Sequence, residues 1–259
     1  MTPLVDSHVH LDDARFDVDR NRVLERARDA GLGAMIVPAI AALDWPALAD
    51  LAARHGDVFP AYGMHPMFLP RHRLTDCDLL DQWLDTHRAV AVGEIGLDYF
   101  VEGLDRDRQQ VLFGRQLSVA ANHRLPVIVH ARRAVDAVIA AIRRHPGTRG
   151  VVHSFSGSVE QAGQLFKLGF LVGIGGPVTY PRAQRLRRVV AELPVEQLLL
   201  ESDAPDQPGI VHRGQRNEPS SITETLAELA SLRGEHVEQL AAATTENARR
   251  LFDLDIPAR

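Results

Sequence analysis

The sequence has one cysteine, one lysine, few aromatic residues and no apolar run long enough to cross a membrane. The single cysteine, Cys77, excludes an intramolecular disulfide framework and a cysteine-based zinc cluster. Aromatic residues make up 5% of the chain, so there is no obvious track on which the bases of a single strand could stack. The formal net charge of −5 supplies no general attraction to nucleic acid or to an anionic membrane.

The remaining composition is typical of a folded domain. Hydrophobic residues make up 45% and charged residues 24% of the 259 residues. No linker or low-complexity segment divides the chain, so we expect a single domain over residues 1–259. The first residues lack the basic and apolar segments of a signal peptide, which predicts a cytoplasmic protein with no membrane contact. No feature indicates an obligate protein partner.

Short β-rich runs alternate with longer amphipathic runs along the chain. The β-rich runs are residues 3–10, 34–40, 58–63, 89–96, 126–131, 150–155, 170–176 and 197–204. The helical runs are residues 18–30, 46–54, 79–86, 106–122, 135–144, 159–168, 181–193, 220–232 and 235–251. Eight β/α units in about 250 residues predict a (β/α)8 TIM barrel, here with an extra C-terminal helix. A doubly wound open sheet shares this alternation and is the structural alternative.

Four histidines lie in or at the end of the expected strands. His8 and His10 are two residues apart in the first strand, so their side chains would share one face. Two adjacent neutral imidazoles suit a metal ion, and an equally weighted alternative is a pair of polar histidines bonded to loops. His130 and His153 each end an apolar strand, where a lone histidine is more often a satisfied core residue.

Two carboxylates occupy similar positions. Glu94 lies inside the apolar strand VAVGEIGLDY, where an unpaired charge is costly, so it needs a cation or strong donors. An arginine salt bridge is the alternative, because 28 of the 29 basic residues are arginines. Asp203 follows the apolar run QLLLES, and its alternative role is a helix N-cap or turn residue before Pro205.

All six residues fall at or near the ends of strands 1, 4, 5, 6 and 8, which converge on one face of a TIM barrel. They are His8, His10, Glu94, His130, His153 and Asp203. Four imidazoles and two carboxylates predict a site for two divalent cations with a bridging carboxylate. Because histidine ligands favour softer metals, we expect Zn²⁺, with Mn²⁺, Ni²⁺ or Mg²⁺ as alternatives.

Seven segments extend this pattern over nearly the whole chain. They are DSHVHLDD (6–13), GMHP (63–66), VGEIGLDY (92–99), PVIVHAR (126–132), HSFSGS (153–158), ESDAP (201–205) and RNEP (216–219). On these segments the chain resembles the TatD family of metal-dependent deoxyribonucleases, which are amidohydrolase-like TIM barrels. The stretches HARRAVD and GIGGPVTYPRA are most similar to an uncharacterised bacterial branch of that family.

The resemblance implies a division of the ligands between two metals. The first metal would be held by His8, His10, Glu94 and Asp203. The second would be held by Glu94, His130 and His153, with Glu94 bridging. It also implies that His65 contacts the substrate phosphate or the leaving oxygen, whereas its place before Pro66 alone suggests only a turn histidine.

These residues predict a metal-dependent hydrolase of ester bonds, acting on phosphodiesters through an activated water. Asp203, a ligand with a free oxygen, would orient the water or accept its proton, so Asp203, Glu94 and His65 are the expected catalytic residues. Arg132 and Arg216 would meet the phosphate charge. The glycines of residues 173–176 could add backbone N–H groups or only form a tight turn. The resemblance implies a 3′-to-5′ exodeoxyribonuclease, with a DNA 3′ end or a small phosphoester as substrate.

Two other functions compete with this interpretation. An amidohydrolase-type enzyme would cleave a C–N or ester bond of a small molecule, and many such relatives bridge their metals through a carboxylated lysine. The only lysine, Lys167, lies in a helical run and is not expected to reach the site. A metal-binding scaffold without catalysis would have no reason to keep all six ligands. Arg133 and residues 206–207 depart from the usual family pattern near the expected pocket.

Overall fold

The computed structural model of the chain describes residues 2–256. Its eight strands form one parallel sheet in which each strand pairs with the next along the sequence. They are β1 (Leu4–Asp6), β2 (Leu32–Pro38), β3 (Val58–Tyr62), β4 (Ala91–Asp98), β5 (Val127–Arg132), β6 (Gly150–Val152), β7 (Phe170–Ile174) and β8 (Leu198–Leu200). The Ser7 amide donates to the Leu200 carbonyl at 3.0 Å, so the chain leaving β1 meets β8 and nearly closes the barrel.

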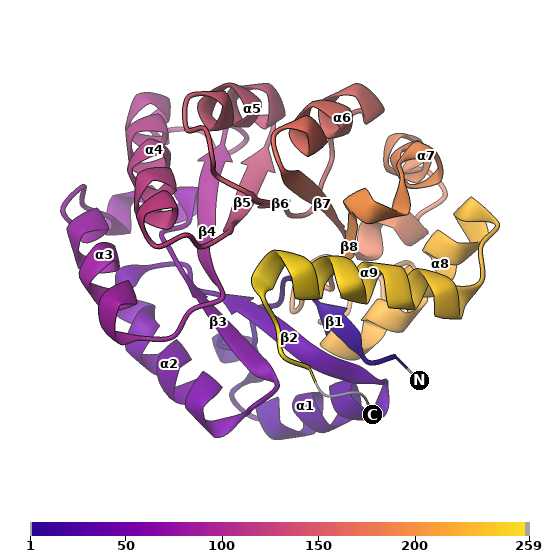
Figure 1. Cartoon of the computed structure of the whole chain (residues 1–259). Coiled ribbons are helices and arrows are strands. Elements are labelled where there is room, and N and C mark those ends of the chain that lie inside the picture. The colour runs from indigo at the N-terminus through magenta and orange to yellow at the C-terminus, as the bar shows by residue number, and fades with distance from the viewer. Residues whose placement is uncertain (1, 257–259) are drawn as a thin grey trace.

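Helices surround the barrel, one after each strand (Figure 1). They are α1 (Arg20–Asp29), α2 (Trp45–Arg54), α3 (Asp76–Thr86), α4 (Arg106–Asn122), α5 (Val135–Arg143), α6 (Val159–Lys167), α7 (Gln184–Glu192), α8 (Ile222–Arg233) and the additional α9 (Val237–Phe252). Local signals fix several ends: a capping box between Ser158 and Gln161 starts α6, and Gly234, with φ of 64°, ends α8. The TIM-barrel prediction is confirmed, and the open-sheet alternative is wrong.

The helix α9 covers one end of the barrel, as Figure 1 shows. Its Leu251 and Phe252 pack in one cluster with inward-facing strand residues such as Ile36 and Val151. The Thr245 hydroxyl donates to the carbonyl of Pro3, the residue before β1, at 3.0 Å. These contacts place α9 at the N-terminal ends of the strands, so the opposite, C-terminal end is the open one. Among the helices of residues 2–256, none is long and apolar enough to span a membrane.

Strand β4 deviates from regular pairing where it carries Glu94. Its register with β5 shifts between Val92 and Ile95, a type of irregularity that redirects side chains near active sites. Gly96 follows with φ of 135°, and a Cβ at this position would lie 2.1 Å from the His130 carbonyl oxygen. Only glycine therefore allows β4 to approach the part of β5 that carries His130.

We expect Gly96→Ala to lower the free energy of unfolding by at least about 3 kcal/mol, because backbone strain adds to a clash with main-chain atoms. Gly163→Ala is the matched control, since Gly163 lies within α6 and an added Cβ meets nothing within 4 Å. This change should stabilise the protein by about 0.5–1 kcal/mol through helix propensity. Urea unfolding of the three proteins measures both effects, and equal stabilities would contradict the role of Gly96.

Candidate metal centre

The six predicted ligands come together at the open end of the barrel. Glu94 and His130 lie on β4 and β5, and the other four follow the ends of β1, β6 and β8. The expectation that His8 and His10 lie within the first strand is wrong, because β1 ends at Asp6. Backbone hydrogen bonds nevertheless hold this segment in place. The amide of Val9, between the two histidines, donates to the Ile36 carbonyl at 3.0 Å, and the His10 amide donates to the Ala204 carbonyl at 2.7 Å.

One oxygen of Glu94 faces the histidines that follow β1. Oε2 lies 3.1 Å from Nε2 of His8 and 3.5 Å from Nε2 of His10. The same two nitrogens lie 3.6 and 3.8 Å from Oδ1 of Asp203. Three of these residues, His8, His10 and Asp203, offer one donor atom each within 4.8 Å of one another. This half of the cluster has the composition of a metal site with two imidazoles and two carboxylates.

The other oxygen of Glu94 faces a second group of histidines. Oε1 lies 2.7 Å from Nε2 of His153, 3.0 Å from Nδ1 of His130 and 2.8 Å from Nε2 of His65. Glu94 thus directs its two oxygens to two different sets of imidazoles. This is the arrangement that a carboxylate bridging two metal ions requires.

The charge of Glu94 is compensated by imidazoles. Its side chain is 1% exposed, and among residues 2–256 it has no ion pair with an arginine or the lysine, so the arginine salt-bridge alternative is wrong. Burial opposes ionisation, yet the surrounding histidines, His153 foremost, hold the pKa of Glu94 well below its usual range. Against the opposing effect of burial, Glu94 in turn raises the pKa of His153 to about 10. A positive charge is therefore required beside Glu94, either a proton or a metal ion.

The donor set fits divalent cations. Burial lowers the pKa of His8 well below its usual range, so this imidazole is neutral and can offer a lone pair. The Glu94 Oε2 atom beside it is buried and, within the described chain, makes no hydrogen bond. A neutral imidazole that faces a buried carboxylate oxygen at 3.1 Å leaves that oxygen without a partner, which a cation bound between the two would supply.

Asp98 fixes the orientation of His130, and its role was not predicted from the sequence. Burial alone would raise the pKa of Asp98, but the hydrogen bond from His130 outweighs this effect and the pKa is lowered to about 2. The ionised carboxylate accepts a hydrogen bond from Nε2 of His130 at 2.8 Å, so in the neutral ring Nδ1 keeps the lone pair that faces Glu94. The other oxygen of Asp98 accepts bonds from the amides of Phe100 and Val101, both at 2.9 Å.

His65 has the same Nε2–H tautomer as the neutral ring of His130, but it turns the other ring nitrogen, Nε2, towards Glu94. Its Nδ1 accepts a hydrogen bond from the Met67 amide at 3.0 Å, which leaves the ring proton on Nε2. Burial lowers the pKa of His65 to about 4, so the ring is neutral near pH 7. Although His65, Glu94 and His130 form a third group with metal-binding geometry, His65 presents an N–H to this group. This favours its expected role as a donor to substrate over a role as a ligand.

The departures from the family pattern at residues 206 and 207 have defined contacts. Gln207 donates hydrogen bonds to Oδ2 of Asp203 and, at 2.7 Å, to the hydroxyl of Ser154. Asp206 instead accepts two hydrogen bonds from Arg15, at 2.9 and 2.8 Å. Gln207 thus holds the Asp203 oxygen that does not face His8 and His10.

The two arginines expected to bind substrate have different surroundings. Arg216 uses all four N–H groups of its terminal nitrogens on the Arg15 carbonyl, Asp19 and Glu218, at 2.7–3.0 Å. The guanidinium of Arg216 is therefore engaged in an ion-pair network within the protein. Arg132 is exposed, and its guanidinium lies 3.7 Å from the centroid of the Phe100 ring.

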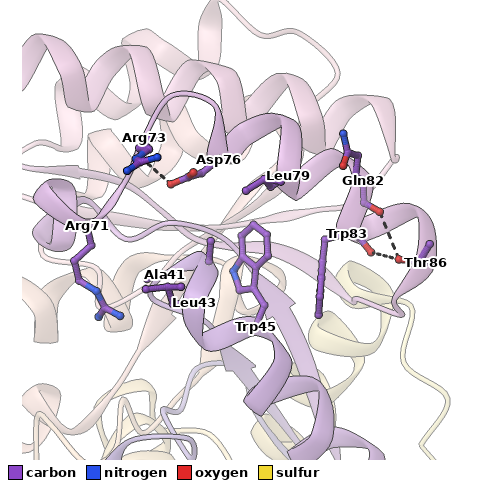
Figure 2. Close-up of a pocket in the computed structure, with 11 residues that line it drawn as sticks. Ala41, Leu43, Trp45, Arg71, Arg73, Asp76, Leu79, Gln82, Trp83 and Thr86 are labelled. Atoms are coloured by element: carbon purple, nitrogen blue, oxygen red, sulfur yellow. Dashed lines mark hydrogen bonds between the residues drawn. The ribbon is translucent and has the colours of Figure 1, made fainter.

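Two hollows lie near this end of the molecule. A hollow of about 310 Å³ adjoins the centre through Ser154 and Gln207 and is also lined by Gly173, Arg182 and Arg185. A larger one, of about 560 Å³, lies between α2 and α3 (Figure 2). Its lining includes Trp45, Arg71 and Trp83, but none of the six predicted ligands. The smaller hollow also contains none of the six ligands, but it lies next to the centre, because Ser154 follows His153 and Gln207 bonds to Asp203.

A TIM barrel with this histidine–carboxylate cluster is a metal-dependent hydrolase. Residues 5–253 match the family model described as "TatD related DNase". The chain therefore belongs to the family of TatD-related DNases, as its sequence motifs predicted.

Relatives of this family match over nearly the whole chain. The chain is 42% identical over 253 residues to the "Uncharacterized metal-dependent hydrolase YjjV" of Escherichia coli K12, covering 96% of this chain and 98% of that protein. The crystal structure of YjjV, described as a TatD homolog, matches with a TM-score of 0.94 at 41% identity, covering 97% and 98% of the two chains. A protein of Erwinia tasmaniensis named "3′-5′ ssDNA/RNA exonuclease TatD" is 32% identical over 262 residues, covering 97% of this chain and all of its own.

We predict that metal-saturated protein contains two divalent ions per chain. Glu94→Gln should lose both, because each oxygen of Glu94 serves one set of imidazoles. Elemental analysis after gel filtration measures the stoichiometry, and Glu160→Gln, at the exposed start of α6, controls for the loss of one carboxylate. One ion or fewer in the wild-type protein would contradict the dinuclear arrangement.

Asp98→Asn should lower the affinity for one of the two metal ions by about 10- to 100-fold, as is typical when the partner that orients a histidine ligand is lost. Competition with a chromophoric chelator measures the two affinities separately. Asp206→Asn is the matched control, since Asp206 pairs with Arg15 and not with a predicted ligand. Unchanged affinities, or equal loss at both positions, would show that Asp98 does not act through His130.

Proposed function

We propose that the protein is a 3′-to-5′ exonuclease that hydrolyses phosphodiester bonds of single-stranded DNA with two divalent cations, zinc being the expected metal. The observation that carries the proposal is the bridging position of Glu94, with Oε2 at 3.1 Å from His8 and Oε1 at 2.7 Å from His153. When bound, two such ions lower the pKa of water and neutralise charge on a phosphate.

The side chains around the ligands supply the other requirements of hydrolysis. Asp203 would orient the attacking water and accept its proton through the oxygen that does not face His8 and His10; this oxygen is not free as expected, because it accepts a hydrogen bond from Gln207. Gln207 holds this oxygen and limits the positions that this carboxylate can take. His65 would donate its Nε2–H to a phosphate or leaving oxygen, because its Nδ1 is already bonded to the Met67 amide.

The neighbouring hollow supports cleavage at a strand end. Its volume of about 310 Å³ is at the lower limit of small-molecule sites, so it suits one terminal residue and not a duplex. Arg132 would pair with a phosphate beside the one that reacts at the centre. The net charge of −5 is consistent with contacts to few phosphates, so binding should weaken only shallowly with salt.

Lysine-bridged amidohydrolase chemistry finds no support in the structure. Lys167 is exposed at the end of α6, three residues before β7 begins, and so lies towards the closed end of the barrel. Hydrolysis of a small amide or ester without a lysine bridge is the remaining alternative, and the substrate screen below separates it from nuclease activity.

The decisive experiment uses single-stranded DNA labelled at the 3′ or the 5′ end. We expect early release of the 3′ label as mononucleotide and progressive shortening of the 5′-labelled strand. Asp203→Asn should lower turnover by orders of magnitude, and His65→Ala should lower turnover with nearly unchanged metal content. Efficient cleavage of circular single strands, or rapid hydrolysis of a small amide or lactone with DNA left intact, would overturn the proposal. Loss of metal from His65→Ala would instead identify His65 as a ligand.

A further inference from the structure

Two adjacent arginines share one aromatic ring at the open end of the barrel. The guanidinium carbons of Arg132 and Arg133 lie 3.7 and 4.7 Å from the centroid of the Phe100 ring. Both arginines are exposed, and Phe100 is 43% exposed. Cation–π contacts of this kind hold the guanidinium groups in place but do not neutralise their charge.

The two charges have no acidic partner. Two other arginines of this end, Arg15 and Arg216, do have acidic partners: Arg15 bonds to Asp13 and Asp206, and Arg216 bonds to Asp19. In the described part of the chain, no carboxylate forms an ion pair with Arg132 or Arg133. Two like charges held over one ring repel each other, and an anion bound between them would relieve this repulsion. Arginine forks match the oxygens of a phosphate.

The pair is firmly connected to the metal centre. Arg132 and His130 are two residues apart on β5, so their side chains leave the same face of the strand. Asp98 accepts the His130 ring N–H with one oxygen and the Phe100 amide with the other. The loop that carries Phe100 is also joined to the end of β5, where Arg132 is the last residue and Arg133 follows, by the Tyr99 amide, which donates to the Arg132 carbonyl at 2.9 Å.

We propose that Arg132, Arg133 and Phe100 form a subsite for a backbone phosphate of single-stranded nucleic acid, distinct from the phosphate that reacts at the metal centre. The inference rests on the proposed nuclease function and assigns a role to Arg133, which departs from the family pattern. The subsite lies outside the ring of buried ligands, where the nucleic-acid strand that leads away from the cleaved bond would be exposed to solvent. Phe100 positions the two guanidinium groups, and a phosphate of the nucleic-acid strand supplies the missing negative charge.

The test measures binding separately from cleavage. Fluorescence anisotropy of a labelled ten-residue oligodeoxynucleotide, added to protein inactivated by Asp203→Asn, gives its affinity at several salt concentrations. Arg133→Gln should weaken binding about 5- to 10-fold and make the slope of log affinity against log salt shallower by about 0.7, the value for one phosphate contact on a single strand. Phe100→Leu should weaken binding without changing that slope, because no charge is lost. Metal content is measured on every variant.

Arg88→Gln is the matched control. Arg88 also lies over a phenylalanine ring, 6.0 Å from the centroid of Phe59, but it precedes β4 and so lies at the opposite end of the barrel. The Arg88→Gln variant should bind the oligonucleotide with the same affinity and the same salt slope as the parent protein. Equal losses in Arg88→Gln and Arg133→Gln, or unchanged binding by Arg133→Gln, would overturn the subsite.

Two further outcomes separate the subsite from the proposed function. If the oligonucleotide binds through Arg133 but the active enzyme leaves DNA intact, the subsite stands and the nuclease assignment falls. If the enzyme trims DNA while Arg133→Gln binds it normally, the nuclease assignment stands and the subsite falls. Inorganic phosphate is the competing probe: displacement of the oligonucleotide at equal phosphate-group concentration would show a general anion site and overturn its assignment to a strand.

Discussion

A carboxylate buried to 1% exposure, with no arginine or lysine partner in residues 2–256, must have positive charge beside it, and the open end of this barrel is arranged around that requirement. The imidazoles near Glu94 come from segments far apart in the sequence. The barrel is what brings them together, because the ends of its parallel strands meet in a ring. Protons and metal ions compete for these nitrogens, so metal uptake is expected to release protons.

Much of this arrangement could be predicted from the sequence, because each predicted ligand directly follows or lies in an apolar strand. Hydrophobic alternation gave the eight β/α units, although β1, β6 and β8 are only three residues long in the structure. The position of His8 and His10 was less accurate, since the strand ends before them. Their convergence depends on hydrogen bonds to segments that no local pattern specifies.

The supporting residues could not be predicted for the same reason. Asp98 follows Glu94 by four residues, and the second acid of GEIGLDY was the only available signal, but its role depends on His130 of the next strand. Buried Glu201, which accepts the Ser154 amide at 2.5 Å and whose pKa burial raises to about 8, likewise has meaning only in three dimensions. Arg216 was expected to bind substrate, but it pairs with Asp19 and Glu218. The motif that contains Arg216 does not indicate that Asp19 lies beside it.

The closure of one barrel end by α9 also determines where Pro3 and Ile256 lie. Pro3 and Ile256 both pack against Gly33 at the start of β2, on the face opposite the metal centre. Attachment to a solid support next to Pro3 or Ile256 would therefore leave the mouth of the barrel facing free solution. The molecule is suited to being immobilised in a single orientation, with its metal centre presented outwards.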